Sequence, residues 1–440
     1  MRTVVRRRAR ALPTGLTVCL ALAGVSCGGD DDPKPAVDGG VDGGGDALLP
    51  PGAGDSGLDG AQPGADGGDA SGPSAGRPVT EARLAGLTVP AGFSVRPYAR
   101  ELGNPVGLVR APDGSVLVSR PVPGDVIRLR DVDGDGVAEQ RTTVVAGVPG
   151  LSGLALAGDR LLVASESTVF SAPLGADGTA MAPMAIVLEL PSGGRNPFRT
   201  LAVGPEGRLY ITVGSSCDAC VEANPRSATI LRAGSGGADV GVLATGLRQA
   251  LGLAFHPVSG ELWATDQGAV EQGGDLFDEL NRITQASDYG WPYCHGKKHP
   301  NFAIAPPAGG SIPAYCANTE GAQVELVARG GPAGLAFYTG TQFPADYQND
   351  AFVAMYGQEP GLATSGFKVV RVSFEAGLPT TSDDFLTGFL IENGQAYFGR
   401  PAGVVVAVDG ALLVSDAYNG IVYRIAHGTP PASPDAGAGG

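Results

Sequence analysis

The sequence predicts an all-β fold: a six-bladed β-propeller that follows a disordered N-terminal tether. Two observations predict the propeller. One phrase recurs six times, an apolar strand followed by a glycine-containing turn and a second apolar strand. Glycine is also very frequent, with 70 of 440 residues, as a chain with many tight turns requires. One such unit cannot bury both of its faces alone, so six units predict blades packed around a common axis.

The first 27 residues resemble an export signal of the lipoprotein type. A basic start is followed by a short apolar core over residues 16–25. Cys27 comes next, after a serine, although Gly24 stands where the lipoprotein pattern usually has leucine. We expect Cys27 to carry a lipid and to anchor an exported protein at the bacterial cell envelope, in the periplasm or at the cell surface. The alternative is an ordinary secretory signal that is cleaved nearby.

Residues 28–80 are a low-complexity segment of Gly, Ala, Asp and Pro. Ten aspartates in it face only Lys34 and Arg77, and its apolar residues show no period. Such a segment cannot bury enough apolar area to offset the entropy of the chain. We therefore expect 28–80 to be a disordered linker and 428–440 a disordered tail, with the propeller over 81–427.

The charge of the chain limits its partners. The formal net charge is −15, which argues against a nucleic-acid partner because phosphates are bound by clustered Lys and Arg. After the N-terminus the sequence has no apolar run of about 18 residues, the minimum for a spanning helix. The predicted contact with a membrane is therefore the lipid anchor alone.

The six copies of the phrase divide the folded part in order. They occupy residues 105–119, 151–164, 199–212, 251–265, 332–354 and 401–415. The gap between the fourth and fifth copies is wide, and it holds an acidic loop and two cysteines. We expect functional groups to be concentrated in this insertion, since the loops of a propeller commonly carry its ligand site.

The acidic loop runs from Thr265 to Cys294. Its oxygen-bearing side chains are Asp266, Asp275, Asp278, Glu279, Asn281 and Asp288. Carboxylates together with free backbone carbonyls are the ligands that calcium prefers. A solvated acidic loop is the alternative, but the loop ends in an aromatic turn, 289–292, that solvation alone does not require.

A second acidic segment also resembles a calcium loop. Asp131, Asp133 and Asp135 alternate along it, and Gly136 permits a sharp turn. Glu139 comes too early to be the last ligand of an EF-hand. The sequence therefore favours calcium here, with an acidic hairpin turn as the alternative.

Four cysteines remain in the folded part, an even number that suits an oxidising compartment. We expect two disulfides, Cys217–Cys220 and Cys294–Cys316. A zinc site is the alternative for four cysteines. No local motif of a hydrolase or of a nucleotide-binding enzyme occurs, so neither class is indicated.

Most of residues 83–426 resembles the glucose/sorbosone dehydrogenase family, and members of the sorbosone dehydrogenase type are the most similar. The matching phrases lie at 199–210, 213–220, 244–248, 260–266, 278–281, 289–294, 367–371, 384–389 and 399–401. Members of this family are six-bladed propellers that use pyrroloquinoline quinone with calcium. The resemblance implies oxidation of a sugar or a polyol, with the electrons passed to an acceptor.

The resemblance also implies cofactor-binding residues. Arg248 matches the arginine that contacts the carboxylates of the quinone, and Gln249 follows it where asparagine is usual. Arg400 and Lys368 match positions that neutralise the cofactor. A planar guanidinium suits a carboxylate because it can form two parallel hydrogen bonds.

The same resemblance implies two calcium positions in the insertion. Gly268 and Ala269 stand where the family offers backbone carbonyls to the calcium ion on the cofactor. Glu279 and Tyr289 match a second, structural calcium position.

One departure from the family affects the chemistry directly. The position of the catalytic histidine is occupied by Asn196. An amide cannot act as a general base near neutral pH. Glu222 and Glu359 are the candidates to replace the histidine. The alternative to a dehydrogenase is a non-catalytic, calcium-stabilised propeller that binds a carbohydrate or a protein.

Overall fold

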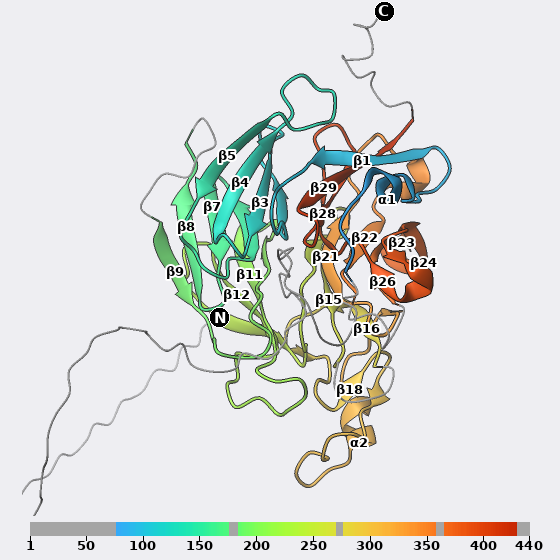
Figure 1. Ribbon diagram of the computed structural model, residues 1–440. Helices are drawn as coiled ribbons and strands as arrows, with labels where there is room; N and C mark the ends of the chain where they lie inside the picture. The colour runs from blue at the N-terminus through green and yellow to red at the C-terminus, as the bar shows by residue number, and fades with distance from the viewer. Residues whose placement is uncertain (1–75, 176–183, 270–275, 358–364, 429–440) are drawn as a thin grey trace, which may run out of the picture. The chain divides into compact units, whose positions relative to one another are not determined.

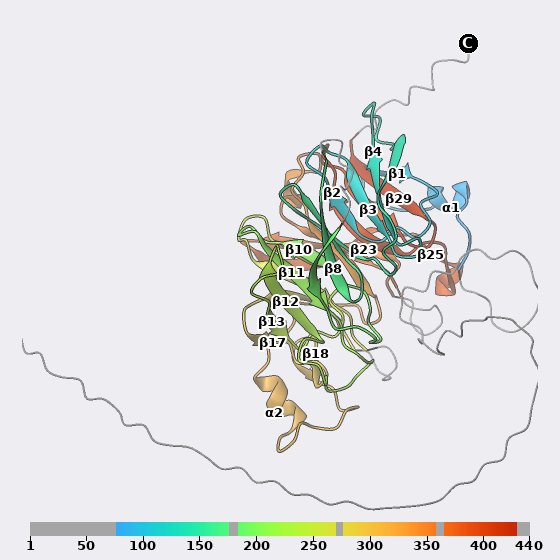
Figure 2. The ribbon, with the colours of Figure 1, turned by 90° about the vertical axis from the view of Figure 1, so that its left-hand side faces the viewer.

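The computed structural model describes residues 76–175, 184–269, 276–357 and 365–428. These residues form six antiparallel blades whose innermost strands contact one another in a closed ring (Figures 1 and 2). The predicted all-β, six-bladed propeller is confirmed. The predicted signal peptide, Cys27 and most of the linker and tail lie outside the described residues.

The first three blades are built from consecutive strands, which follow one another from the axis outward. Blade 1 contains β2 (Leu108–Arg110), β3 (Val116–Arg120), β4 (Asp125–Arg130) and β5 (Gln140–Val145). Blade 2 contains β6 (Gly153–Ala157), β7 (Arg160–Ala164), β8 (Thr168–Pro173) and β9 (Ala185–Glu189). Blade 3 contains β10 (Leu201–Val203), β11 (Arg208–Val213), β12 (Thr229–Gly234) and β13 (Gly241–Thr245), with β17 (Ser287–Asp288) added in parallel at its edge.

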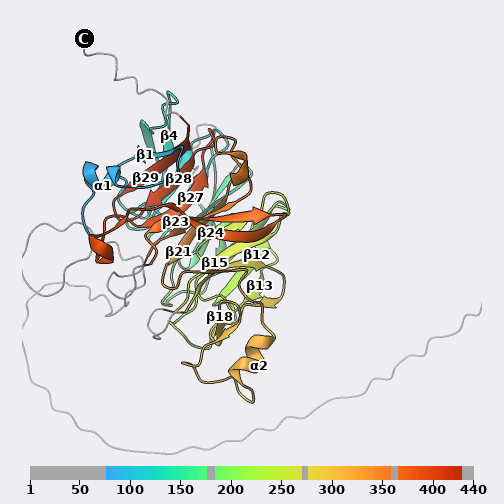
Figure 3. The ribbon, with the colours of Figure 1, turned by 90° about the vertical axis from the view of Figure 1, so that its right-hand side faces the viewer.

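The last three blades include one strand from the beginning of the chain. Blade 4 contains β14 (Leu253–Phe255), β15 (Leu262–Asp266), β16 (Asp278–Ile283) and β20 (Val324–Leu326). Blade 5 contains β21 (Pro332–Phe337), β22 (Ala351–Met355), β23 (Lys368–Glu375) and β24 (Leu378–Leu386). Blade 6 contains β27 (Pro401–Val406), β28 (Leu412–Asp416), β29 (Ile421–His427) and β1 (Phe93–Ala99). Figure 3 shows β1 beside β29 at the outer edge of this blade.

Short elements lie outside the blades. These are α1 (Glu81–Ala85), α2 (Ile312–Ala317), η1 (Ala345–Tyr347), η2 (Glu392–Gly394), and the hairpins β18 (Cys294–His295) with β19 (His299–Pro300) and β25 (Leu390–Ile391) with β26 (Ala396–Tyr397). The side chain of Ser311 caps α2 by accepting a hydrogen bond from the backbone N–H of Ala314. All three ribbon views show α2 projecting away from the blades. Among the described residues, no helix is long and apolar enough to cross a membrane.

The glycine of the recurring phrase is needed where neighbouring blades meet. A Cβ atom on Gly403 would lie 2.1 Å from the carbonyl oxygen of Val106, and one on Gly334 would lie 2.5 Å from that of Ala402. An apolar residue follows this glycine in five of the six phrases, and in the third phrase Leu201 follows Thr200. These six apolar residues line the central channel. These channel residues are Leu108, Leu154, Leu201, Leu253, Leu335 and Val404. The repeated Gly-apolar pair is therefore the contact between the innermost strands.

Hydroxyl groups of second strands join one blade to the next. The Oγ of Ser415 accepts a hydrogen bond from the N–H of Gly403 in its own blade and donates to the carbonyl of Val106 in blade 1, both at 2.7 Å. Ser119 makes the corresponding two bonds between blades 1 and 2, both at 2.8 Å. Ser415 thus closes the ring between the last blade and the first.

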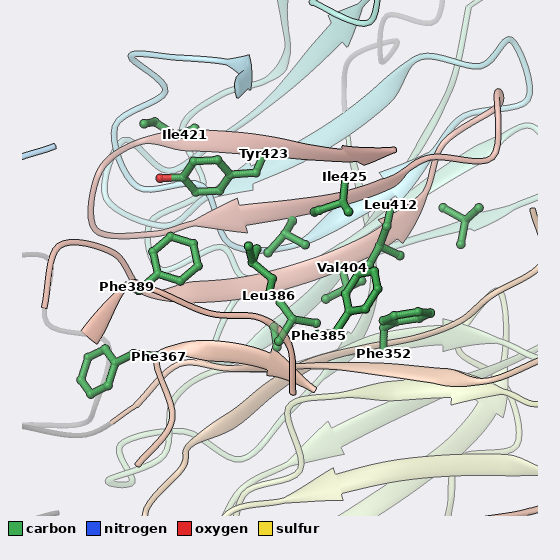
Figure 4. Packing of buried hydrophobic residues seen from close by; sticks show 14 of the residues in the cluster. Phe352, Phe367, Phe385, Leu386, Phe389, Val404, Leu412, Ile421, Tyr423 and Ile425 are labelled. Atoms are coloured by element: carbon green, nitrogen blue, oxygen red, sulfur yellow. The ribbon is translucent and has the colours of Figure 1, made fainter. Parts of the chain in front are cut away.

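The largest group of buried apolar side chains fills the space between blades 5 and 6 (Figure 4). Phe352 and Phe385 come from blade 5, and Leu412 and Tyr423 come from blade 6. All four are at most 2% exposed. Burial of such a side chain stabilises the fold by ~1.5–3 kcal/mol, so this interface contributes strongly to the packing of the ring.

The described part of the chain begins against blade 6. The backbone N–H of Arg77 donates to the carbonyl of Tyr397 at 2.8 Å, and its guanidinium pairs with Glu392 at 2.8 Å. Composition assigns these residues to the linker 28–80. The structure instead places 76–80 on the propeller, because backbone pairing, an ion pair and the packing of Val79 against the apolar cluster hold this segment.

Candidate active site

Loops at one end of the propeller bring the candidate residues together. Arg248 and Gln249 precede β14, Arg400 precedes β27, and Asn196 precedes β10. The carbonyl of Arg248 accepts a hydrogen bond from the N–H of Ser215 at 2.7 Å, and the Nδ2 of Asn196 donates to the carbonyl of Ser215 at 2.9 Å. Two of the predicted site positions are therefore connected through a single residue.

Arg248 lies at the centre of the site and is only 2% exposed. Its Nη2 donates to Oδ1 of Asp218 at 2.6 Å, and its Nε donates to the backbone carbonyl of Asp218 at 2.9 Å. Its Nη1 donates to the carbonyl of Gln267 at 3.3 Å. The guanidinium also lies 5.7 Å from the ring of Trp291. The predicted cofactor contact is thus a buried cation that already has a carboxylate partner.

Buried carboxylates hold the arginine-bearing turns in blades 4 and 6. Asp266, at the end of β15, accepts the backbone N–H of Arg248 at 2.8 Å and that of Gln249 at 2.6 Å. Asp416, at the end of β28, accepts the backbone N–H of Arg400 at 2.8 Å. Burial raises the pKa of Asp266 to about 7 and also raises the pKa of Asp416. In blades 4 and 6, an aspartate at the end of the second strand therefore holds the turn that carries an arginine of the site.

Aromatic rings surround the Arg400 guanidinium. Its Cζ lies 4.3 Å from the ring centre of Tyr397, 4.7 Å from that of Tyr356 and 5.2 Å from that of Phe367. Its Nη1 donates to the carbonyl of Gly357 at 2.9 Å. Cation–π attraction of this kind fixes a guanidinium in place.

Lys368, also predicted to neutralise the cofactor, has a different partner. Its ammonium lies 2.6 Å from Oδ1 of Asp384, between β23 and β24. The structure therefore surrounds Arg400 with aromatic rings and pairs Lys368 with a carboxylate at the edge of blade 5.

Backbone oxygens crowd around Gly268. A Cβ atom at this position would lie 2.9 Å from the carbonyl oxygen of Leu276 and 3.1 Å from that of Phe277. The N–H of Gly268 donates to the buried carboxyl of Asp278 at 2.9 Å, and burial raises the pKa of Asp278 to about 7. Ala269 follows and is buried. Converging carbonyls next to a buried carboxyl group are suitable ligands for a hard cation.

Glu279 lies behind this turn, in β16. Its carboxylate accepts hydrogen bonds from the N–H of Gly296 and from Nδ2 of Asn281, the second at 2.8 Å. Burial, and then the neighbouring Asp266, raise the pKa of Glu279 well above its usual value. Oδ1 of Asn281 is buried and has no hydrogen-bond partner among the described residues. A buried carboxylate next to an amide oxygen that receives no hydrogen bond is a suitable environment for a cation.

Tyr289, the other predicted residue of this calcium position, uses its hydroxyl elsewhere. The hydroxyl donates to the carbonyl of Arg282 at 2.6 Å and accepts from the N–H of Thr284 at 3.1 Å. Any contact of Tyr289 with a cation would therefore come from its backbone carbonyl.

The loop with Asp131, Asp133 and Asp135 joins β4 to β5. β4 runs away from the site, so this loop lies at the opposite end of blade 1. One carboxylate oxygen of each aspartate, together with one of Glu139, lies within 4.8 Å of the others. The same side chains also accept hydrogen bonds from amides of the loop, such as that of Gly134 to Asp131 at 2.7 Å. The alternating pattern does bring its carboxylates together.

The amide of Asn196 is fixed in the wall of the site. Its Nδ2 donates to the carbonyls of Ser215 and Cys217, at 2.9 Å and 3.4 Å, and the residue is 3% exposed. Glu222 accepts hydrogen bonds from the hydroxyl groups of Ser215 and Ser216. Asn196 and Glu222 therefore bind the same short loop, Asn196 through backbone carbonyls and Glu222 through hydroxyl groups. Glu359, the other candidate base, lies outside the described residues.

Both predicted disulfides, Cys217–Cys220 and Cys294–Cys316, are present. This excludes the alternative of a zinc site made from these four cysteines. The first disulfide encloses Asp218, the carboxylate partner of Arg248, which sequence reasoning did not single out. Its position between two cysteines was a signal, but only the fold places it beside an arginine 30 residues away.

Sequence reasoning treated Trp291 only as part of a rigid turn. In the structure it packs against Ala269 and Leu276. Its ring N–H is buried and has no acceptor among the described residues. It is therefore an unused donor of a residue whose ring lies 5.7 Å from the Arg248 guanidinium, and a polar ligand could satisfy it.

Comparisons with known proteins agree with this geometry. The family model described as Glucose / Sorbosone dehydrogenase matches residues 102–414. The chain is 31% identical over 191 residues to an uncharacterized protein of Borreliella burgdorferi, covering 42% of this chain and 48% of the relative. It is 34% identical over 120 residues to aldose sugar dehydrogenase YliI of Escherichia coli, covering 27% and 29%. The alignments thus span half or less of these curated relatives.

Solved structures with the same fold include a holo form of a pyrroloquinoline quinone domain and a quinone-bound enzyme. The pyrroloquinoline quinone domain of pyranose dehydrogenase from Coprinopsis cinerea, in its holo form, has a TM-score of 0.65 at 20% identity, covering 78% of this chain and 97% of that one. The quinone-bound aldose sugar dehydrogenase of Streptomyces coelicolor has a TM-score of 0.56 at 21% identity, covering 77% and 99%. At these identities the likeness establishes the fold.

Proposed function

Because this chain belongs to the glucose/sorbosone dehydrogenase family, we propose that it is an exported quinoprotein that oxidises a sugar or a polyol. The proposed cofactors are pyrroloquinoline quinone and calcium. The observation that carries the proposal is the buried Arg248 at one end of the propeller, 5.7 Å from the ring of Trp291, whose ring N–H lacks an acceptor among the described residues. A buried cation and an unused donor fit an anionic, polar cofactor.

The residues of the site divide the binding of the cofactor among them. Arg248 would hold a carboxylate of the quinone, and Arg400 would add a second positive charge that its aromatic neighbours keep in place. Trp291 would offer its N–H and its ring face. When bound, the quinone supplies the two-electron acceptor that amino-acid side chains lack.

Calcium is proposed at the turn that holds Gly268 and Ala269. Carbonyl oxygens converge there beside Asp278, and the buried pair of Glu279 and Asn281 lies behind it. An ion at the turn would polarise an adjacent carbonyl as a Lewis acid. A calcium ion at the Asp131–Asp135 loop is proposed separately, as a structural ion far from the site.

The substrate's hydroxyl proton needs an acceptor, and Asn196 is not one. Its amide has no basic atom, and its Nδ2 is committed to two backbone carbonyls. We assign Asn196 the role of holding residues 215–217. Glu222, which accepts hydrogen bonds from the hydroxyl groups of the same loop, is the described carboxylate that we propose takes the proton.

A second candidate function rests on one departure from the family and one contact in the site. Asn196 stands at the position of the family's catalytic histidine, and Arg248 is already paired with Asp218. A propeller that has retained its calcium positions but lost turnover would act as a binding protein for a carbohydrate or a protein.

Export and anchoring are proposed from the chain's other features. The two disulfides suit an oxidising compartment. The proposed anchor is a lipid on Cys27, from which residues 28–75 would lead to the propeller. Mass spectrometry of the protein from membranes would detect a lipid on Cys27. As a second test, a Cys27→Ser variant should appear in the soluble fraction.

The experiment that tests the activity is a titration of the purified protein with pyrroloquinoline quinone in calcium. Binding is followed by quinone absorbance, and a panel of sugars and polyols is then added with an electron-accepting dye. Binding with dye reduction supports the dehydrogenase. Binding without reduction across the panel favours the second candidate, and no binding in excess calcium contradicts the quinoprotein.

A further inference from the structure

We propose that Asp218 is an internal counter-ion of Arg248, and that a carboxylate of an anionic ligand replaces it on binding. The inference rests on the proposed function, because Arg248 is the residue assigned there to the carboxylates of the cofactor. It adds a residue that sets the affinity of the site for anions.

Asp218 satisfies Arg248 with two of its atoms. Oδ1 accepts from Nη2 at 2.6 Å, and the backbone carbonyl accepts from Nε at 2.9 Å. The arginine side chain is 2% exposed and the aspartate side chain is 10% exposed. A guanidinium buried this deeply is strongly destabilising without a counter-charge. Asp218 therefore stabilises the site while no anionic ligand is bound.

A ligand carboxylate and Asp218 need the same donors. Each nitrogen of the guanidinium already donates once, and Nη1 donates to the carbonyl of Gln267 at 3.3 Å. A guanidinium binds a carboxylate best through two parallel N–H groups. Both pairs of parallel N–H groups, Nε with Nη2 and Nη1 with Nη2, include Nη2, so a ligand carboxylate competes there with the Asp218 carboxylate.

The structure supplies a second cation for the displaced carboxylate. Nε of Arg195 lies 3.8 Å from Oδ1 of Asp218, and the Arg195 side chain is 23% exposed. A shift of the carboxylate toward Arg195 keeps it paired in a more exposed position. Arg195 is thus the proposed partner of Asp218 in the ligand-bound state.

The disulfide restricts this shift to the side chain. Asp218 lies between Cys217 and Cys220, which are bonded to each other. Asn196 holds the carbonyl of Cys217 at 3.4 Å, and the hydroxyl groups that bind Glu222 hold the preceding residues. The backbone carbonyl of Asp218 therefore stays on Nε of Arg248 while the carboxylate turns away.

The test compares Asp218→Asn with the wild-type protein. The probe is benzene-1,3,5-tricarboxylate, a redox-inactive tricarboxylate, and binding is measured by isothermal titration calorimetry. The asparagine keeps the size of the side chain but removes the competing charge. The expected result is binding at least about tenfold tighter in D218N than in the wild type. Equal or weaker binding in D218N overturns the proposal, as does the absence of tricarboxylate binding in both proteins.

Two further variants assign the effect to the site. Arg248→Gln should bind the probe more weakly than the wild type, because it removes the cation. Asp239→Asn makes the same charge change on an exposed residue in the β12–β13 connection, at the other end of blade 3. D239N should leave the affinity unchanged, and a tenfold gain there would overturn the proposal by attributing the effect to net charge.

D218N has a second readout if the unpaired arginine prevents folding. The proposal then expects millimolar tricarboxylate to restore the folded state, measured by circular dichroism, because the probe supplies the missing counter-charge. No restoration overturns the proposal. Titration with pyrroloquinoline quinone separates this inference from the proposed function. Tighter tricarboxylate binding by D218N without binding of the quinone would support the inference and contradict the quinoprotein.

Discussion

The carboxylate of Asp416 accepts the backbone N–H of Arg400 at 2.8 Å. It also accepts the backbone N–H groups of Tyr418 and Asn419, at 3.0 Å and 3.2 Å, while the residue is fully buried. One buried charge thus organises both the turn that presents Arg400 and the turn that connects β28 to β29.

Asp416 predicts a specific dependence of stability on pH. Burial raises its folded-state pKa above the unfolded value, so between the two pKa values the folded state binds more protons. Its contribution to the free energy of unfolding is therefore largest below about pH 4 and declines as the pH rises through the folded-state pKa. When urea denaturation is measured across this pH range, the free energy of unfolding should fall less steeply with pH in Asp416→Asn than in the wild type. An unchanged slope would contradict the assignment.

Ser415→Ala should weaken the closure of the ring. The change leaves the N–H of Gly403 and the carbonyl of Val106 without their partner in a buried position. A loss of ~1–3 kcal/mol in the free energy of unfolding is expected. Ser119→Ala, with the same geometry between blades 1 and 2, should lose a similar amount, and Ser167→Ala, on an exposed residue, should lose little. A loss below about 0.5 kcal/mol in S415A would show that water replaces the hydroxyl.

Asn196→His should raise the rate of dye reduction if the lost base limits turnover. A positioned general base is worth about 10²–10⁴-fold in rate, and the gain should appear in kcat more than in the affinity for the quinone. Asn196→Gln is the matched control, since it keeps an amide and adds no base. If N196H binds the quinone but remains as slow as N196Q, another step or group limits the reaction.

The two disulfides should differ in their contribution to stability. Cys294–Cys316 bonds residues 22 positions apart, and Cys217–Cys220 bonds residues three apart. Loop-closure entropy predicts a loss of ~3 kcal/mol for the C294A/C316A variant and a smaller loss for C217A/C220A. Urea denaturation under oxidising conditions measures both. A larger loss in C217A/C220A would instead indicate that this loop mainly supports the Arg248–Asp218 pair.

Calcium should stabilise the protein through two separable positions. Glu279→Gln changes the buried carboxylate beside Asn281, and Asp133→Asn changes the exposed loop at the far end of blade 1. Each variant should lose part of the rise in Tm that calcium gives the wild-type protein, and the double variant should lose most of it. Calorimetric titration with calcium after chelation counts the sites. A wild-type Tm that does not respond to calcium would contradict both positions.

The sequence predicts the fold because the cause of its repetition is local. The Gly-apolar pair is needed at contacts between innermost strands, as Gly403 and Val106 show, and it recurs in five of the six blades. The sequence also indicates Arg248 and the cysteine pairs, through phrases shared with a family.

Other parts of the site depend on contacts that no local pattern records. The pairing of Asp218 with Arg248, and of Lys368 with Asp384, follows from how separate loops and strands meet in space. The contact of residues 76–80 with β26 and η2 depends on a backbone hydrogen bond and an ion pair, which composition does not register. These are the features that the structure adds.

The pairing of β1 with β29 has a consequence for how the protein is made. Phe93 is the register partner of His427, so the first strand of the propeller pairs with its last. During synthesis from the N-terminus, β1 leaves the ribosome long before its partner exists. Such distant pairings fold slowly and leave strand edges exposed meanwhile. Blade 6 therefore cannot be completed until the last strand of the propeller has been synthesised.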